Sequence, residues 1–306
     1  MKCIGGLSLT NIYLYGMILI SNSFLLAGDY PEADTYGEIN EKYILPGGET
    51  GTCATVLSSL GCSVKMDGTH MGNNTFYKIQ DFYKNTRVDI SSLTFDNNYN
   101  GLQDYVLIDK TTRTPFGMFN KYFSDSKKRW NIPKKSDIIN AEVVGLDPFF
   151  NEQSTMVAKI CKDYNKPYVV IDCPYDSEMN KYASISVISN EYIRNNYKDI
   201  DKTELFNKYT ENSSGLIIFT FGSKSIMYGR KNEEIKFLEP FKIKPVSTLG
   251  AGDCFKAGCV YALFKKMSDD DCVKFASATA AIACMNFPIP LNPPTLEKIN
   301  NLISQY

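Results

Sequence analysis

The sequence predicts an α/β protein with one large, mostly parallel sheet covered by helices on both faces, and a second, smaller sheet. Short apolar segments bounded by Gly, Pro and Asn alternate with segments of helical apolar spacing, which is typical of a parallel sheet between two helical layers. Two other stretches, 12–45 and 100–123, carry strand patterns and no helix. We therefore expect a core built from 1–11, 46–99 and 124–306, and a lid built from 12–45 and 100–123.

The elements expected in the first half of the chain follow from local residue patterns. Glu49–Leu60 is expected to be a helix, because its apolar residues share one face and Gly61 follows the last of them. Asp104–Ile108 and Pro115–Tyr122 are strand-like and are joined by a short polar turn, which predicts a hairpin. The other expected strands are Lys2–Gly6, 12–20, 39–45 and Ser63–Met66, and the other expected helix is Thr75–Lys84.

The second half of the chain continues the alternation. Tyr168–Asp172 is expected to be a buried strand, because it is apolar up to its last residue and follows Pro167. Phe237–Val246 mixes apolar and charged residues with two prolines, which suits an edge strand or an extended connection. The other expected strands are Ile138-Ile139, Val143–Leu146, Ser184–Ser189 and Leu216–Thr220, and the expected helices are 152–163, Thr203–Glu211, Asp253–Met267, 268–285 and Thr295–Ile303.

The overall charge argues against a nucleic-acid or membrane partner. The 306 residues carry a formal net charge of −1, so no net field favours polyanions or anionic lipid. A basic run with one tryptophan lies between Ser124 and Ser136, and without a second such run it is expected to be a solvated loop. The apolar run 12–28 is interrupted by polar residues and is too short to span a bilayer, so a cytoplasmic protein is expected.

Cysteine and histidine usage excludes two further kinds of site. The nine cysteines are scattered and form no CxxC pair, so they are expected to be small core residues in a reducing compartment. His70 is the only histidine, which excludes a metal site with several histidine ligands. Any catalytic triad would likewise depend on this single residue.

The turn within Ser247–Gly258 carries the most specific chemical signal. Gly250 and Gly252 let the backbone approach a ligand closely, and Asp253 is expected to be the N-cap of the following helix. Unpaired amides at such a turn, with the helix dipole behind them, form a site for a phosphate or another anion. The turn therefore brings a carboxylate next to an anion site. A glycine-rich turn capped by Asp is also common in α/β proteins, so the turn alone leaves a purely structural role open.

Two standard nucleotide-binding motifs are missing from the chain. No GxxxxGK[ST] segment occurs, and Gly250-Ala251-Gly252 is followed by Phe255 instead of the third glycine of a dinucleotide fingerprint. Other motifs accompany the turn in a fixed order: Gly47-Gly48 with Ala54 and Leu60-Gly61, Arg113-Thr114, Asp147-Pro148, Asn190-Glu191, Thr220–Ser225, and Asp253 with Ala257-Gly258. Through these motifs, and over nearly its whole length, the chain resembles the ribokinase-like (PfkB) family of carbohydrate and nucleoside kinases.

The resemblance implies a three-layer α/β/α ribokinase-like fold and an ATP-dependent kinase that transfers the γ-phosphoryl group to a hydroxyl of a small sugar-like acceptor. Asp253 would accept the proton of the attacking hydroxyl, while the amides of Gly250, Ala251 and Gly252 stabilise charge on the transferring group. The acceptor-binding residues that it implies are Asn11, Gly47, Gly48, Thr52, Arg113 and Asp147. The nucleotide-binding residues are Asn190, Thr220, Gly222, Ser223 and Ser225, with Mg²⁺ on the phosphates and either Glu191 or water as its further ligand.

Several positions depart from the family pattern. Asn11 stands where members usually have Asp, and Thr52 stands where they commonly have Asn, so an atypical acceptor is expected. Ser247 replaces an Asp, which puts activation by a monovalent cation in doubt. Ile193 stands where a magnesium-associated Glu is usual, and Ser225 replaces a common Gly.

Two other functions remain open at this level. A nucleoside kinase of the same fold would need an apolar slot for the base, which Tyr105, Phe116 and Phe119 could supply. A ligand-binding or regulatory member without turnover is the second alternative, because several family positions are changed. The open edge of the lid sheet could also pair with a second copy of the chain, which would make a homodimer.

Overall fold

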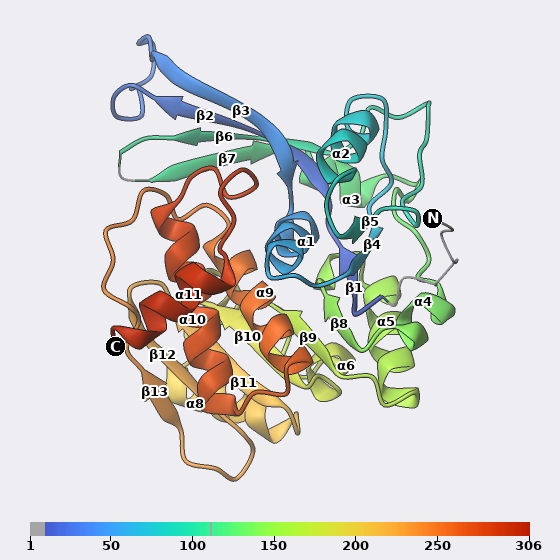
Figure 1. Cartoon of the computed structure of the whole chain (residues 1–306), viewed down its shortest axis with the longest axis vertical. Helices are drawn as coiled ribbons and strands as arrows, with labels where there is room; N and C mark the ends of the chain where they lie inside the picture. The colour runs from blue at the N-terminus through green and yellow to red at the C-terminus, as the bar shows by residue number, and fades with distance from the viewer. Residues whose placement is uncertain (1–9, 111) are drawn as a thin grey trace, which may run out of the picture.

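The computed structural model describes residues 10–110 and 112–306, and the described chain forms two sheets (Figure 1). The larger sheet has nine strands in the order β13-β12-β11-β10-β9-β8-β1-β4-β5, and the smaller has four in the order β3-β2-β6-β7. The expected three-layer α/β class with a separate small sheet is confirmed. The expected strand Lys2–Gly6 lies outside the described residues.

Parallel strands make up most of the larger sheet, and two antiparallel strands close one edge. Its strands are β1 (Ile12–Gly16), β4 (Val64–Gly68), β5 (Val88–Asp89), β8 (Val143–Leu146), β9 (Tyr168–Ile171), β10 (Ile185–Ser189), β11 (Leu216–Phe221), β12 (Lys224–Gly229) and β13 (Lys236–Leu238). Because both faces of the central strands are covered, β1, β8 and β9 are buried at every residue.

Helices cover both faces of this sheet (Figure 1). Ile12 and Leu14 of β1 enter a core shared with α1, α9 and α10, whereas Tyr13 and Tyr15 enter a second core shared with α5. The helices are α1 (Glu49–Ser59), α2 (Phe76–Tyr83), α3 (Phe119–Ser124), α4 (Lys135–Asn140), α5 (Glu152–Asp163), α6 (Glu178–Lys181), α7 (Asn190–Asn196), α8 (Lys202–Glu211), α9 (Ala251–Phe264), α10 (Asp269–Met285) and α11 (Leu296–Ser304), with a 3₁₀ turn at Pro148–Phe150.

The smaller sheet extends away from the layered core as the lid (Figure 1). It consists of β2 (Leu19–Leu26), β3 (Ile39–Gly47), β6 (Gln103–Ile108) and β7 (Arg113–Gly117). The expected lid segment 12–45 begins too early, because β1 lies between β8 and β4 in the larger sheet. Its residues are apolar on both faces, as a central parallel strand requires.

Two other sequence-based assignments were wrong. The expected strand Pro115–Tyr122 ends at residue 117, and α3 follows because Phe119 and Tyr122, three residues apart, both pack into the aromatic core around Trp130. Ile138 belongs to α4 and not to a strand, since its buried side chain packs against the α5 side of the sheet. Phe237–Val246, expected to be an edge strand or an extended connection, begins in the edge strand β13 and continues as the connection toward α9.

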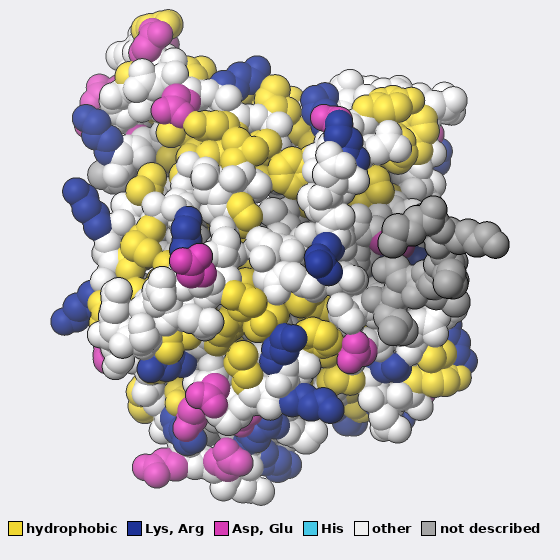
Figure 2. Space-filling model, viewed as in Figure 1, with side chains coloured by type: hydrophobic (Ala, Val, Ile, Leu, Met, Phe, Trp, Pro, Cys, Tyr) yellow, Lys and Arg dark blue, Asp and Glu magenta, His cyan; other side chains and the backbone are white. Residues whose placement is uncertain are grey.

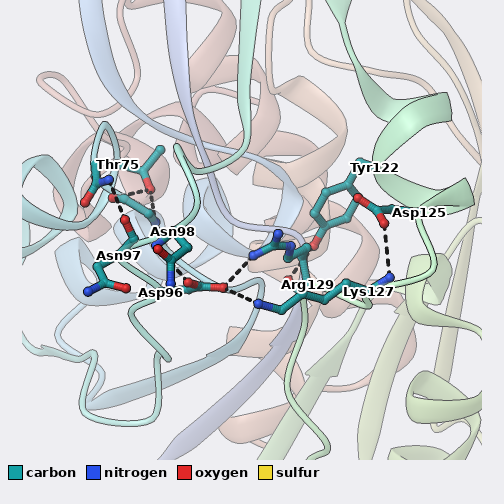
Figure 3. A network of polar contacts seen from close by, with 10 residues as sticks. Thr75, Asp96, Asn97, Asn98, Tyr122, Asp125, Lys127 and Arg129 are labelled. Carbon is teal, nitrogen blue, oxygen red and sulfur yellow. Dashed lines mark hydrogen bonds and ion pairs between the residues drawn. The ribbon is translucent and has the colours of Figure 1, made fainter.

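Two residues of the basic run after Ser124 form ion pairs with Asp96 (Figure 3). Asp96 accepts from Lys127 at 2.9 Å and from Arg129 at 2.5 Å, and Arg129 also lies over the ring of Tyr99 at 4.6 Å. The run is therefore only partly the solvated loop that its composition predicts. Figure 2 shows Lys and Arg side chains interspersed with Asp and Glu over the visible face.

Every cysteine in the described part of the chain is a free thiol, and all but Cys284 are buried, as expected for small core residues. Among the same residues, no helix is long and apolar enough to cross a bilayer. Most of the apolar run 12–28 instead forms the two strands β1 and β2.

Candidate active site

The carboxyl ends of the parallel strands bring polar residues together at one edge of the larger sheet. Gly16 ends β1, Asp147 follows β8, Asp172 follows β9, Ser189 ends β10 and Thr220 lies near the end of β11. In open α/β sheets, ligands bind outside this edge. The candidate site is therefore the space between this edge, the first turns of α1 and α9, and the lid.

The start of α9 contains the carboxylate that the sequence singles out. The helix begins at Ala251, and its N-cap is Gly250, whose φ of 75° lies in the left-handed region that favours glycine. Asp253 is therefore the third helical residue. The sequence-based expectation that Asp253 is the N-cap was wrong. It remains in the first turn, where the helix dipole favours a negative charge.

The backbone of this turn leaves room for a ligand beside Asp253. A Cβ added at Gly252 would meet nothing within 4 Å, whereas one at Gly250 would lie 3.5 Å from Thr52 Cγ2 and 3.7 Å from Asp253 Oδ2. Gly250 thus lies between Thr52 and the carboxylate. The amide of Ala251 donates to the carbonyl of Thr248 at 3.3 Å, so the turn itself uses one of the three amides expected at the anion site.

Charges around Asp253 adjust its acidity. Burial and the Asp147 carboxylate raise the pKa of Asp253 to about 7, while Lys256 and Arg113 act in the opposite direction. Burial, Asp253 and Asp147 also raise the pKa of Glu49 well above its usual range. Asp253 is consequently a carboxyl group that can gain and lose a proton near neutral pH, as a general base requires.

Asp147 lies beneath the site with no solvent exposure. Its Oδ2 accepts from the Met17 amide at 3.0 Å and from Thr50 Oγ1 at 2.8 Å, and its Oδ1 accepts from Lys256 Nζ. The sequence-based expectation was an acceptor-binding carboxylate. In the structure its oxygens are engaged by the protein, so Asp147 organises the floor of the site.

The start of α1 lies beside this floor. Gly48 is the N-cap with φ 79° and ψ 160°, and a Cβ there would lie 2.5 Å from the carbonyl oxygen of Met17. Gly47 packs against β2, because its Cβ would lie 3.0 Å from that of Ser21. The glycine pair therefore brings the first turn of α1, including the buried Thr52, close to the base of the lid.

The inner face of the lid contacts the turn that precedes α9. Arg113 donates from its guanidinium to Thr248 Oγ1 at 2.9 Å. Arg113 pairs with Ile108 of β6, so the two side chains lie on the same face of the lid sheet. Asp104 lies four residues before Ile108 on the same strand and therefore shares that face, because side chains alternate along a strand. Asp104 lies opposite Ser21, whose hydroxyl donates to its carboxylate, and burial raises the pKa of Asp104 to about 6. Its Oδ1 is buried and has no hydrogen-bond partner in the described part of the chain.

Asn11 is not part of the site. It precedes β1 at the opposite end of the strand, where its side chain bonds to the Ser63 amide and to Glu142 Oε1, both at 3.1 Å. The expectation was wrong because it took Gly6 as the end of the first strand and placed the acceptor-binding residue five positions after it. The strand that leads into the site ends at Gly16, and five residues further on is Ser21 on the inner face of the lid.

The residues expected to bind nucleotide lie along the same edge of the larger sheet, at the ends of β10 and β11. Asn190 and the exposed Glu191 begin α7, and Thr220 on β11 pairs in register with Ser189, directly before them. Gly222, with φ 67°, and Ser223 form the exposed tip of the β11–β12 hairpin. Ser225 on β12 instead donates to the carboxylate of Glu239, which follows the neighbouring strand β13.

No cluster of three or more His, Cys, Asp or Glu side chains suited to a metal ion occurs within residues 10–110 and 112–306. A magnesium ion carried by nucleotide phosphates needs only one or two protein carboxylates. The exposed Glu191 at the start of α7 fits that requirement.

Sequence reasoning missed four charged residues of this region: Glu49, Asp104, Asp172 and Lys256. Asp172 is held by Ser189, whose amide and hydroxyl donate to its oxygens at 2.7 and 2.9 Å, and burial raises its pKa to about 6. Glu49 and Lys256 each lie within three residues of a recognised motif residue, so proximity to those motifs was the available signal. Asp104 had none, because only strand pairing brings it to Ser21.

Comparison with known proteins agrees with this geometry. The family model described as pfkB family carbohydrate kinase matches residues 28–287. The chain belongs to this family. The resemblance inferred from the motifs is thereby confirmed.

Individual relatives cover most of the chain. A 5-dehydro-2-deoxygluconokinase from Clostridium botulinum is 22% identical over 294 residues, which span 87% of this chain and 85% of the relative. Arabidopsis thaliana ribokinase, solved with ribose and ATP, has a TM-score of 0.79 at 15% identity, covering 96% of this chain and 98% of that one. A nucleoside kinase from Methanocaldococcus jannaschii has a TM-score of 0.75 at 20% identity, covering 97% and 99%. These structures share the fold of this chain.

Proposed function

We propose that this protein is an ATP- and Mg²⁺-dependent kinase that phosphorylates a hydroxyl of a small, polar, sugar-like acceptor. The observation that carries the proposal is the start of α9, where the Asp253 carboxylate, with a pKa of about 7, adjoins the open backbone at Gly252. Phosphoryl transfer depends on positioning and charge neutralisation more than on covalent chemistry by the protein. Asp253 takes the proton of the attacking hydroxyl, and the first-turn amides face the transferring phosphoryl group.

The acceptor lies between the inner lid face and the first turn of α1. Asp104 Oδ1 is a buried oxygen to which residues 10–110 and 112–306 supply no hydrogen-bond donor, and such an atom is costly unless a ligand donor reaches it. Thr52 adds a side chain next to Gly250. Arg113 closes the lid onto Thr248, which excludes water that would otherwise compete as acceptor.

The nucleotide lies over the ends of β10 and β11. Asn190, Thr220, Gly222 and Ser223 line that side, and Glu191 is the carboxylate available to Mg²⁺. The ion supplies neutralisation of the phosphate charge during transfer. The Arabidopsis ribokinase of the same fold was solved with ATP, which supports the same nucleotide here.

A nucleoside acceptor is a weaker candidate on the lid geometry. Tyr105 and Phe116 pair with each other on the face opposite to Asp104 and Arg113, because neighbouring residues of a strand alternate in direction. They are 49% and 46% exposed, and Phe119, the first residue of α3, packs against the core on the α5 side of the larger sheet. The apolar slot expected from these three side chains is therefore absent from the inner face.

An acceptor panel with ADP release as readout tests the function. Pentoses, hexoses, ketoses, keto sugar acids and nucleosides are each incubated with ATP, Mg²⁺ and the purified chain. 5-Dehydro-2-deoxygluconate is the first compound to try, because relatives named for it match most of the chain. Asp253→Asn should lower kcat by ~10²–10⁴ while ATP binding persists. Calorimetric binding of an acceptor with no ADP from any compound would favour the regulatory alternative instead.

A further inference from the structure

Lys256 is a fully buried lysine within the candidate site. Its ammonium donates to Asp147 Oδ1, and neither side chain has any solvent exposure. Burial alone would lower the pKa of Lys256, but Asp147 raises it, and the net direction is upward. The lysine is therefore a permanent positive charge under the floor of the site.

Stability by itself does not explain this pair. Exchanging a buried ion pair for apolar side chains of similar volume is often neutral or stabilising, because taking two charges out of water is costly. The surroundings are suited to such an exchange, since Cys53, Ala257 and Val260 nearby on α1 and α9 are fully buried. A role for the charge itself is the remaining explanation.

The charge lies where it acts on the catalytic carboxylate. Lys256 is three residues after Asp253 on α9, so the two side chains neighbour each other on the helix surface. The groups that face Asp253 are three carboxyls, Glu49 on α1, Asp147 after β8 and Asp172 after β9, and two cations, Lys256 on α9 and Arg113 on the lid. Lys256 is the fully buried cation of this set.

We propose that Lys256 is a positioning residue of this kinase site, which fixes Asp147 beneath the acceptor and by its charge favours the ionised form of Asp253. The inference rests on the proposed function, in which Asp253 acts as the base. Because Arg113 belongs to the lid, its contribution depends on lid closure, whereas that of Lys256 is present in the open and the closed protein. Asp253 is thus ready to accept a proton before the acceptor arrives.

The test compares two double variants, Asp147→Asn with Lys256→Arg and Asp147→Asn with Lys256→Met. Lys256→Met alone would leave Asp147 buried without a cation, and a proton taken up by Asp147 would obscure the effect. Arginine replaces the lysine because burial without Asp147 would lower the pKa of Lys256, whereas a guanidinium stays charged. The two variants therefore differ in the charge at residue 256. Protein labelled with ¹³C at the aspartate carboxyl is titrated by NMR without ligands, and Asp253→Asn assigns the Asp253 signal.

The Asp253 midpoint should be higher in the methionine variant than in the arginine variant by about one to three pH units. The matched control, Asp147→Asn with Lys65→Met, removes a lysine that pairs with Asp137 on the same sheet and should have the same midpoint as Asp147→Asn alone. Equal midpoints in the arginine and methionine variants would overturn the proposal. Since this readout needs no turnover, it decides the role of Lys256 even if no acceptor is phosphorylated, an outcome that would count only against the kinase function.

Discussion

Arg113 on β7 of the lid and Thr248 in the turn before α9 are joined by a hydrogen bond of 2.9 Å. The bond connects the two sheets of the molecule at the point where the proposed base stands, five residues further along the chain. It also brings the guanidinium close enough to lower the pKa of Asp253. In the proposed mechanism, closure of the lid and ionisation of Asp253 are therefore linked through a single side chain.

Arg113→Met should lower kcat/KM for the acceptor roughly ten-fold, because a hydrogen bond to a charged group that holds the lid closed is lost. Steady-state kinetics at pH 8 measure the effect. Thr248→Val removes the same bond from the other side and should match it. If kcat/KM of the double variant falls by the product of the two single-variant factors, the two residues act independently and loss of their shared hydrogen bond is not the cause.

The pH profile should follow the ionisation of Asp253. A base must be deprotonated to accept a proton, and the Asp253 pKa is about 7, so kcat/KM should rise with pH through about 7 and then level off. At two pH units below the midpoint the rate should be about 100-fold under the plateau. The measurement uses saturating Mg²⁺-ATP at every pH, so that titration of the nucleotide does not contribute. A flat profile between pH 5 and 8 would contradict the assignment.

Asp104→Asn should raise the KM of the acceptor ~10- to 100-fold and leave the KM of ATP unchanged, because a charged hydrogen-bond acceptor at the acceptor site is replaced by a neutral amide. Kinetics with each substrate varied separately measure the two constants. Tyr105→Phe is the matched control, since it removes a hydroxyl from the next residue, on the outer face of the lid. An equal loss for both substrates would indicate a structural role for Asp104.

Gly48→Ala should lower the free energy of unfolding by roughly 2–4 kcal/mol, because a Cβ meets the Met17 carbonyl at 2.5 Å in a backbone conformation that only glycine adopts readily. Urea unfolding measures the change. Gly61→Ala has a similar positive φ of 87° with nothing within 4 Å of its Cβ, so it should cost only about 1–2 kcal/mol. Equal losses would mean that the close approach of Met17 is unimportant.

Local patterns were enough to predict much of the fold. Glycine, proline and apolar spacing located most helices and the parallel strands, and the motif around Asp253 indicated the family and placed the start of α9 two residues late. Errors arose where burial and strand order, which are not local, decide the outcome. Ile12 to Gly16 reads as a strand in either sheet, and only its position between β8 and β4 makes it a core strand.

The sequence by itself determined the motifs: a carboxylate at Asp253, glycines at 48 and 250 where the backbone must turn, and a parallel α/β frame that brings strand ends together. Tertiary structure alone decided what surrounds them. It excluded Asn11, turned Asp147 from a ligand for the acceptor into a buried support, and brought Asp104 and Lys256 into the site. The physical reason is that charge and burial depend on residues distant in sequence, whereas turn and helix propensities depend on near neighbours.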